Sequence, residues 1–209
     1  MTAWQHHKGQ AVALARANVD TDQLIPARFM AVPRAEGYAE FLLHDVRRDE
    51  TGVLRRDLAL NNTQEASVLI AGPHFGSGSS REAAVYALVD AGFRAVFAPS
   101  FGDIFAGNAV NNGLLPARIT LAEYEALVSF TGQTTCAVEI DLVKSQATFK
   151  DMSIAFTLDE TWRMKLMKGW DDIDLTRQHA DAIAEFKSDY LNDVPWGTPL
   201  ALDHLRDRS

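Results

Sequence analysis

Two short apolar runs separated by a helical segment constrain the fold of this chain more than any other feature. Residues 67–71 (SVLIA) and 94–98 (RAVFA) are typical of strands that are buried on both faces of a sheet. Residues 82–91 between them predict a helix, and residues 100–111 predict a second helix with Ser100 as its N-cap. Strand, loop, helix, strand and helix in this order predict a parallel βαβ unit, and therefore an α/β fold.

The flanking segments add further strands and helices to this unit. A strand is expected at residues 10–15, and Thr120 with Glu123 forms a capping-box pattern that opens a helix ending at Gly132. Beyond it we expect a strand at 136–142, a hairpin from 147–149 and 154–157, and helices at 159–168 and 175–190. One α/β domain with a helical C-terminal extension accounts for all of these elements.

The length and composition of the chain fit a single domain across residues 1–209. Of the 209 residues, 47% are hydrophobic, and single domains reach roughly 200–250 residues. Residues 45–63 are polar and charged, so this segment is predicted to be a mobile excursion. Residues 192–209 carry Pro195 and Pro199 and are predicted to form a tail or a contact arm.

The charge and the apolar pattern exclude several classes of partner. The formal net charge is −8 and no long cationic run is present, so we expect no binding to nucleic acid or to anionic membranes. No apolar run approaches the roughly 20 residues that a membrane-spanning helix needs. The first ten residues lack the apolar region of a secretory signal, so a cytoplasmic location is expected.

A single thiol, Cys136, limits the metal chemistry of the chain. One cysteine cannot build a disulfide, a zinc site or an iron–sulfur cluster by itself. The six histidines show no metal-ligand spacing apart from the adjacent pair His6 and His7, which is interpreted as part of a solvated tail. We therefore expect no metal site in this chain.

The loop between the first predicted strand of the central unit and the helix after it is the best candidate for chemistry. In open α/β sheets, ligands bind outside the carboxyl ends of the strands, where this loop must lie. Gly76 and Gly78 allow the backbone to approach a ligand closely, and Arg81 offers a fork that matches a carboxylate. Ser79 and Ser80 add two hydroxyls at the start of a helix, where free N–H groups favour an anion.

The same residues also fit an interpretation without catalysis. Ser79 and Glu82 match the S-x-x-E pattern of a capping box, so Ser79 is equally well explained as a helix cap. A glycine-rich turn between strand and helix can also hold a phosphate, but this loop lacks the G-x-x-x-x-G-K-[ST] pattern. The pattern alone leaves capping and catalysis open.

The segment HFGSGSSREAAVYALVDAGFRAVFAPSFGDIFAGNAVNNGLLP resembles the signature block of the small subunits of 3-isopropylmalate dehydratase, a family that matches the swivelling domain of aconitases. Residues 18–26 resemble the N-terminal motif of that family, and residues 170–176 resemble its C-terminal segment. The resemblance covers nearly the whole chain. It implies a swivelling domain of three layers, β/β/α, with a central and largely parallel sheet.

The resemblance also implies a reaction. The family dehydrates 2-isopropylmalate to isopropylmaleate and rehydrates it to 3-isopropylmalate, a step of leucine biosynthesis. Carried onto this sequence, Ser79 is the base that removes a proton, while Gly78, Ser80 and Arg81 hold the substrate. A serine hydroxyl is a weak acid, so its anion needs oriented N–H groups and a cation, as at a helix start beside Arg81.

Further candidates and two departures from the family pattern accompany this assignment. Asp20 and Thr21, with the adjacent Asp22, are candidates to line the mouth of the site, although turn residues of this type explain them equally well. Arg28 is a candidate for a substrate carboxylate, with a surface arginine as the alternative. The family commonly has cysteine at Ser77 and histidine at Ala83, and these two changes bear on pocket detail and substrate identity.

The cofactor implied by the resemblance requires a second polypeptide. The family uses a [4Fe–4S] cluster held by three cysteines, and this chain has one. We therefore expect the cluster on a larger partner subunit, in a heterodimer or heterotetramer that is active only when assembled. The alternatives are a related subunit acting on homocitrate, citramalate or dimethylmalate, and a non-catalytic anion-binding module.

Overall fold

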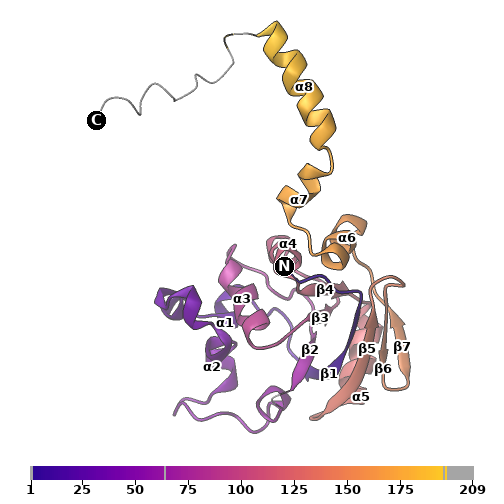
Figure 1. Ribbon diagram of the computed structural model, residues 1–209. Helices are drawn as coiled ribbons and strands as arrows, with labels where there is room; N and C mark the ends of the chain where they lie inside the picture. The colour runs from indigo at the N-terminus through magenta and orange to yellow at the C-terminus, as the bar shows by residue number, and fades with distance from the viewer. Residues whose placement is uncertain (1, 64, 195, 197–209) are drawn as a thin grey trace. The chain divides into compact units, whose positions relative to one another are not determined.

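The computed structural model describes residues 2–63, 65–194 and 196 (Figure 1). Its chain divides into two compact units, Met1–Asp171 and Asp172–Ser209. The first unit contains the whole sheet and the loop of residues 72–81. The second contains α7 (Asp172–Arg177) and α8 (Ala180–Asp193) where the sequence predicts one helix, and the predicted arm at 192–209 lies mostly outside the described residues.

The sheet of the first unit has seven strands in the order β4-β3-β2-β1-β5-β6-β7. Its strands are β1 (His6–Leu14), β2 (Ala66–Ala71), β3 (Ala95–Ala98), β4 (Leu115–Arg118), β5 (Thr135–Asp141), β6 (Gln146–Phe149) and β7 (Met152–Ala155). The neighbours β4, β3, β2 and β1 are parallel, and β5 to β7 continue the sheet as antiparallel strands. The predicted βαβ unit is the centre of the parallel half.

The sheet folds over itself, and this produces two β layers. In a flat sheet, β3 and β6 would lie about 19 Å apart, because four strand spacings separate them. The rings of Phe97 on β3 and Phe149 on β6 are nevertheless only 5.2 Å apart, in an edge-to-face contact. Phe156 also contacts Phe97, at 5.7 Å. The parallel half therefore faces the antiparallel half across a shared apolar core.

Helices on the other face of the parallel strands provide the third layer, and two further helices, α5 (Leu121–Thr131) and α6 (Glu160–Lys168), pack against the core between the β layers. The other helices of the first unit are α1 (Thr21–Leu24), α2 (His44–Arg47), α3 (Glu82–Asp90) and α4 (Asp103–Asn111), with short 3-10 helices at Ala27–Ala31, Arg34–Glu36, Ala39–Phe41 and Ala59–Asn61. Side chains of α3 and α4 share one core with the outward positions of the parallel strands, while Leu127 of α5 and Leu166 of α6 belong to the core between the two β layers. The predicted α/β class and β/β/α layering are confirmed.

The segment 45–63, predicted as a mobile excursion, leaves the core and returns to it. Val46 at its start and Ala59 and Leu60 near its end are buried in the core. Between them, Arg48 and Leu54 form a β-bridge, and the Asp49 carboxylate accepts hydrogen bonds from backbone N–H groups of the turn. The excursion thus contains a hydrogen-bonded turn, while its mobility stays a prediction.

No helix within the described residues combines the length and the apolar character that crossing a membrane requires.

Candidate active site

The loop of residues 72–81 follows β2 and is held on one side by the loop after β1. The Gly76 N–H donates to the Val19 carbonyl at 2.7 Å, and the Thr21 N–H donates to the Ser77 carbonyl at 2.9 Å. The Thr21 hydroxyl, which is 1% exposed, donates to the Ser79 carbonyl at 3.0 Å. These bonds fix the backbone on which the candidate base is mounted.

The loop after β3 holds the other side. The Phe75 N–H donates to the Ser100 carbonyl at 3.0 Å, and the Gly102 N–H donates to the Phe75 carbonyl at 2.9 Å. The Ser100 hydroxyl accepts from the His74 N–H at 2.9 Å instead of capping a helix, and α4 begins at Asp103 with Gly102 as N-cap. The prediction of Ser100 as N-cap was wrong because the carboxyl ends of neighbouring strands meet here and provide a nearer donor.

Gly76 is required by the packing of this loop. Its φ is +71°, and a Cβ at this position would lie 2.2 Å from Cγ of Phe105. Phe105 is 3% exposed and packs edge-to-face on Phe75, so its ring has no room to withdraw. A side chain at position 76 would therefore displace the aromatic cluster beneath the loop.

At Gly78, φ is +104° and a Cβ would contact Thr21 Oγ1 at 3.3 Å, so the loop also passes close to α1.

The candidate base is exposed and its side chain is free of internal bonds. Ser79 and Ser80 are both exposed, and neither hydroxyl has a hydrogen-bond partner within the described part of the chain. The helix α3 begins at Glu82, and its N-cap Arg81 contributes no side-chain cap. Glu82 accepts a hydrogen bond from Asn112 at 2.9 Å and does not reach back to Ser79. The capping-box interpretation of Ser79 and Glu82 was therefore wrong.

Arg81 lies beside these hydroxyls and is paired with an acid. Its side chain is 21% exposed, and its guanidinium forms a hydrogen-bonded ion pair with Asp22, whose side chain is 55% exposed. The sequence indicated Asp22 as a residue at the mouth of the site but gave no sign of this pairing. The cation that a substrate carboxylate would use is thus present and held by a carboxylate of the chain itself.

Asp20 is used by the fold. Its carboxylate caps α1 by accepting from the Gln23 N–H at 2.7 Å, and the Gln23 side chain returns to the Asp20 N–H at 3.4 Å. Asp20 also forms a β-bridge with Ser77. The structure therefore assigns Asp20 and Thr21 to holding the loop, and a contact of either residue with substrate stays a prediction.

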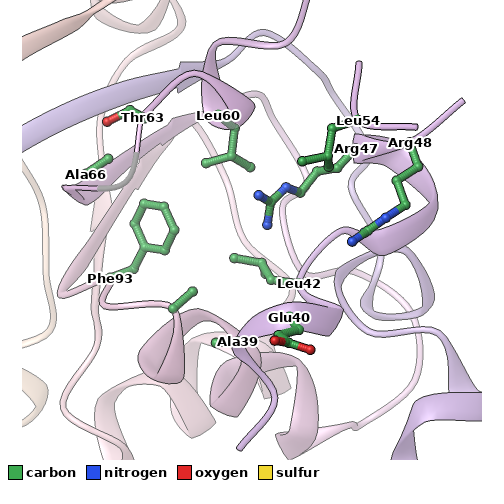
Figure 2. A pocket seen from close by; sticks show the side chains of 11 residues that line it. Ala39, Glu40, Leu42, Arg47, Arg48, Leu54, Leu60, Thr63, Ala66 and Phe93 are labelled. Carbon is green, nitrogen blue, oxygen red and sulfur yellow. The ribbon is translucent and has the colours of Figure 1, made fainter. Parts of the chain in front are cut away.

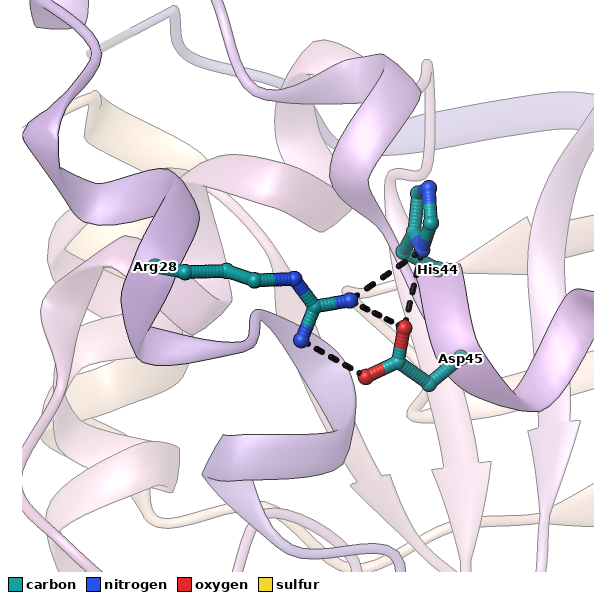
Figure 3. Close-up of polar contacts among 3 residues, drawn as sticks. All are labelled: Arg28, His44 and Asp45. Atoms are coloured by element: carbon teal, nitrogen blue, oxygen red, sulfur yellow. Dashed lines mark hydrogen bonds and ion pairs between the residues drawn. The ribbon is translucent and has the colours of Figure 1, made fainter. Parts of the chain in front are cut away.

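Arg28 belongs to a separate polar cluster (Figure 3). Its Nη1 donates to Asp45 Oδ2 at 2.9 Å, and Asp45 also pairs with His44 at 2.9 Å. The hydrogen bond from Arg28, with the bond from His44, lowers the pKa of Asp45 to about 2. The Arg28 guanidinium also lies over the Phe29 ring at 4.5 Å. The structure thus gives Arg28 an acidic partner on α2, and its contact with substrate stays a prediction.

The two departures from the family pattern lie in different environments. Ser77 is half-buried and contributes its backbone to the bridge with Asp20. Ala83 is 8% exposed and belongs to the core shared by α3 and the sheet. Ala83 therefore adds no polar group to the loop surface, whereas Ser77 keeps a half-buried hydroxyl.

The described residues do not fit an iron–sulfur cluster. They contain no group of three or more His, Cys, Asp or Glu side chains arranged to hold a metal ion. Cys136 on β5 is half-buried, and burial raises the pKa of its thiol. A buried and protonated thiol is a poor metal ligand.

Comparison with known proteins shows the family of this chain. Residues 1–122 match the family described as the aconitase C-terminal domain. The chain is 40% identical over 185 residues to the 3-isopropylmalate dehydratase small subunit of Shouchella clausii, covering 88% of this chain and 94% of the relative. It is 43% identical over 189 residues to the small subunit of Acidothermus cellulolyticus, covering 90% and 94%. The chain belongs to the family of 3-isopropylmalate dehydratase small subunits.

A solved structure of the same family shares the fold. The 3-isopropylmalate dehydratase of Methanocaldococcus jannaschii is similar with a TM-score of 0.63 and 26% identity, covering 86% of this chain and 98% of that one. The resemblance seen in the central sequence block is confirmed, and it extends to the arrangement of the sheet and helices.

Proposed function

We propose that this chain is the small subunit of a 3-isopropylmalate dehydratase and carries the base of the reaction on the loop 72–81. The observation that carries the proposal is the exposed Ser79 hydroxyl, without an internal partner, beside Arg81 at the uncapped start of α3. The family relationship provides the reaction, a hydro-lyase step of leucine biosynthesis. Cytoplasmic location stays a prediction that cell fractionation can test.

In this proposal Ser79 removes the proton next to a substrate carboxylate of 2-isopropylmalate. The electron pair of the broken C–H bond forms the alkene as the C–O bond breaks, so the substrate hydroxyl leaves as hydroxide and isopropylmaleate remains. Addition of hydroxide at the other alkene carbon, with the proton returned from Ser79, gives 3-isopropylmalate. The helix start and the Arg81 cation stabilise the serine anion, because oriented N–H groups and a positive charge favour negative charge in this position.

Arg81, Ser80 and Gly78 hold the substrate. Arg81 leaves Asp22 and pairs with a substrate carboxylate, since its planar fork matches either acid. The Ser80 hydroxyl donates to the same carboxylate. Gly78, which is exposed and has a positive φ, presents its backbone to the substrate. Asp20, Thr21 and Arg28 are proposed at the edge of this site.

We assign the [4Fe–4S] cluster to a larger partner subunit, where it supplies a Lewis acid for the substrate hydroxyl when bound. This chain alone is then inactive, and its loop 72–81 faces the partner in the assembled heterodimer or heterotetramer. The proposal needs no contribution from Cys136.

The test is co-expression with a large subunit followed by an alkene-absorbance assay. The assembled pair should turn over 2-isopropylmalate faster than homocitrate, citramalate or dimethylmalate, and the separate chain should show no activity. Ser79→Ala in the assembled pair should lower turnover roughly 10³-fold, within the range that general bases contribute. Unchanged turnover would eliminate Ser79 as the base, and preference for another acid would reassign the substrate.

A further inference from the structure

An open cavity of about 650 Å³ lies at the opposite end of the β2–α3–β3 unit from the loop 72–81 (Figure 2). Ala66, which begins β2, lines it, together with Ala91 and Phe93, which connect α3 to β3. The loop 72–81 joins the other ends of β2 and α3. The nine residues of α3, about 13 Å in length, therefore separate the cavity from the candidate base.

Two adjacent guanidinium groups, of Arg47 and Arg48, line this cavity. The Nη1 atom of Arg48 is buried and has no hydrogen-bond partner in the described part of the chain, and no ion pair of that part includes either arginine. Burial, and after it the charge of Arg48, lower the pKa of Arg47. Buried donors in proteins are nearly always satisfied, so Nη1 of Arg48 indicates an acceptor from outside the described part of the chain, beside the second cation of Arg47.

The position of Arg47 is fixed before any ligand arrives. Its Nε donates to Asn61 Oδ1 at 2.7 Å, and Asn61 Nδ2 donates back to the Arg47 carbonyl at 2.8 Å and to the Arg55 carbonyl at 2.9 Å. This arrangement leaves both Nη groups of Arg47 to the cavity. Figure 2 shows its guanidinium pointing between Leu60 and Leu42. A donor held in this way loses little conformational freedom when it binds an anion.

The rest of the wall is mostly apolar. Leu42, Leu60 and Phe93 are at most 5% exposed, and Leu54 at the turn of the excursion is 43% exposed. Glu40 is an acidic residue on the same wall. Two cations and one acid leave a net charge of +1, which suits a monoanion better than a dianionic phosphate.

We propose that this cavity is a second binding site, for a small organic anion that joins a carboxylate to an aliphatic chain. The carboxylate pairs with the guanidinium groups of Arg47 and Arg48, whose planar forks match it. The aliphatic chain packs against Leu54, the large exposed apolar side chain of the wall, and both are removed from water there. The site is separate from the loop 72–81, so its occupancy is measurable on this chain without a partner subunit.

The experiment is calorimetric titration of the full chain with three probes. Hexanoate carries both the carboxylate and the chain, hexanamide has the same shape without the charge, and inorganic phosphate has the charge without the chain. Hexanoate should saturate a single site, and the other two should bind at least tenfold more weakly. The absence of a saturable hexanoate signal, or equal binding of all three probes, would overturn the proposal.

Variants of residues that line the cavity test whether hexanoate binds there. Arg48→Met keeps most of the apolar stem and should weaken hexanoate at least tenfold, while Arg56→Met removes an exposed charge from the same excursion and should leave hexanoate binding unchanged. Leu54→Glu, at an exposed position on the wall, should have the same effect as Arg48→Met without disturbing the core. If Arg48→Met does not fold, Leu54→Glu decides, and wild-type affinity in that variant refutes the site.

Discussion

Two helix starts in this chain share one sequence pattern and have different structures. Thr120 caps α5 by accepting from the Glu123 N–H at 3.2 Å, and Glu123 accepts from the Thr120 N–H at 2.7 Å, which completes a capping box. At α3, Ser79 and Glu82 have the same spacing but form no box. The same S/T-x-x-E sequence pattern therefore does not always form a capping box.

The difference has a tertiary cause. The Ser79 carbonyl accepts from the Thr21 hydroxyl at 3.0 Å and from the Arg81 N–H at 2.8 Å, so the chain turns at Ser79 before the helix begins. Glu82 consequently occupies the first helical position instead of the third, and its carboxylate bonds to Asn112. The fold thus leaves the Ser79 hydroxyl without a bond to the helix start, as the proposed role of Ser79 as a base requires. Four predictions test this comparison.

The largest effect on stability is expected from Gly76→Ala. The positive φ and the contact with the Phe105 ring should lower the free energy of unfolding by about 3 kcal/mol or more. Gly92→Ala is the matched control, because Gly92 also has positive φ but has open space around it, and about 1 kcal/mol is expected there. Urea denaturation measures both. Equal losses would mean that the loop is not held by its aromatic support.

Arg81→Lys should distinguish the start of α3, which we propose to be catalytic, from the capped start of α5. In the assembled pair, kcat/KM should fall roughly 10- to 100-fold, because a lysine cannot make the paired hydrogen bonds of a guanidinium with a carboxylate. Arg55→Lys is the control. Arg55 also pairs with an aspartate, Asp57, but lies outside the loop, so this change should leave kcat/KM unchanged. A similar loss in both variants would place the effect outside the site.

Thr120→Ala should lower the free energy of unfolding by about 1 kcal/mol through loss of the cap, with activity retained. Ser79→Ala should change that free energy by less than about 0.5 kcal/mol, because its hydroxyl bonds to nothing in the described structure. Thermal and urea unfolding of the two variants measure the contrast. Destabilisation of Ser79→Ala to the level of Thr120→Ala would restore the capping interpretation.

The smallest effect is expected from Asp22→Asn. The ion pair with Arg81 is partly exposed, and such pairs contribute about 0.2–1 kcal/mol, so releasing Arg81 should lower KM by up to about fivefold. Steady-state kinetics of the assembled pair measure KM, with Asp57→Asn as a control that frees Arg55 instead. A higher KM would show that Asp22 positions Arg81 for substrate and does not compete with it.

Local pattern was enough to predict most of the strands, the helices of the central unit and the position of the loop. The runs at 67–71 and 94–98 became β2 and β3, and Thr120 and Glu123 formed the predicted box. These features are signalled by apolar runs and capping patterns within a few residues, which a sequence encodes directly. The helix predicted at 175–190 was found as two, because a turn at Gln178 and His179 separates α7 from α8.

The sequence by itself determined the α/β class, the family, the loop that carries Ser79 and the shortage of cysteines for a cluster. Only the tertiary structure decided which partner each polar group takes: Asn112 for Glu82, Asp22 for Arg81 and Asp45 for Arg28. It also decided that the sheet folds Phe97 onto Phe149 and that Nη1 of Arg48 is buried without a hydrogen-bond partner among the described residues. The physical reason is that the partners of these groups are distant in sequence. Only the folded geometry sets which of them lies within hydrogen-bond distance.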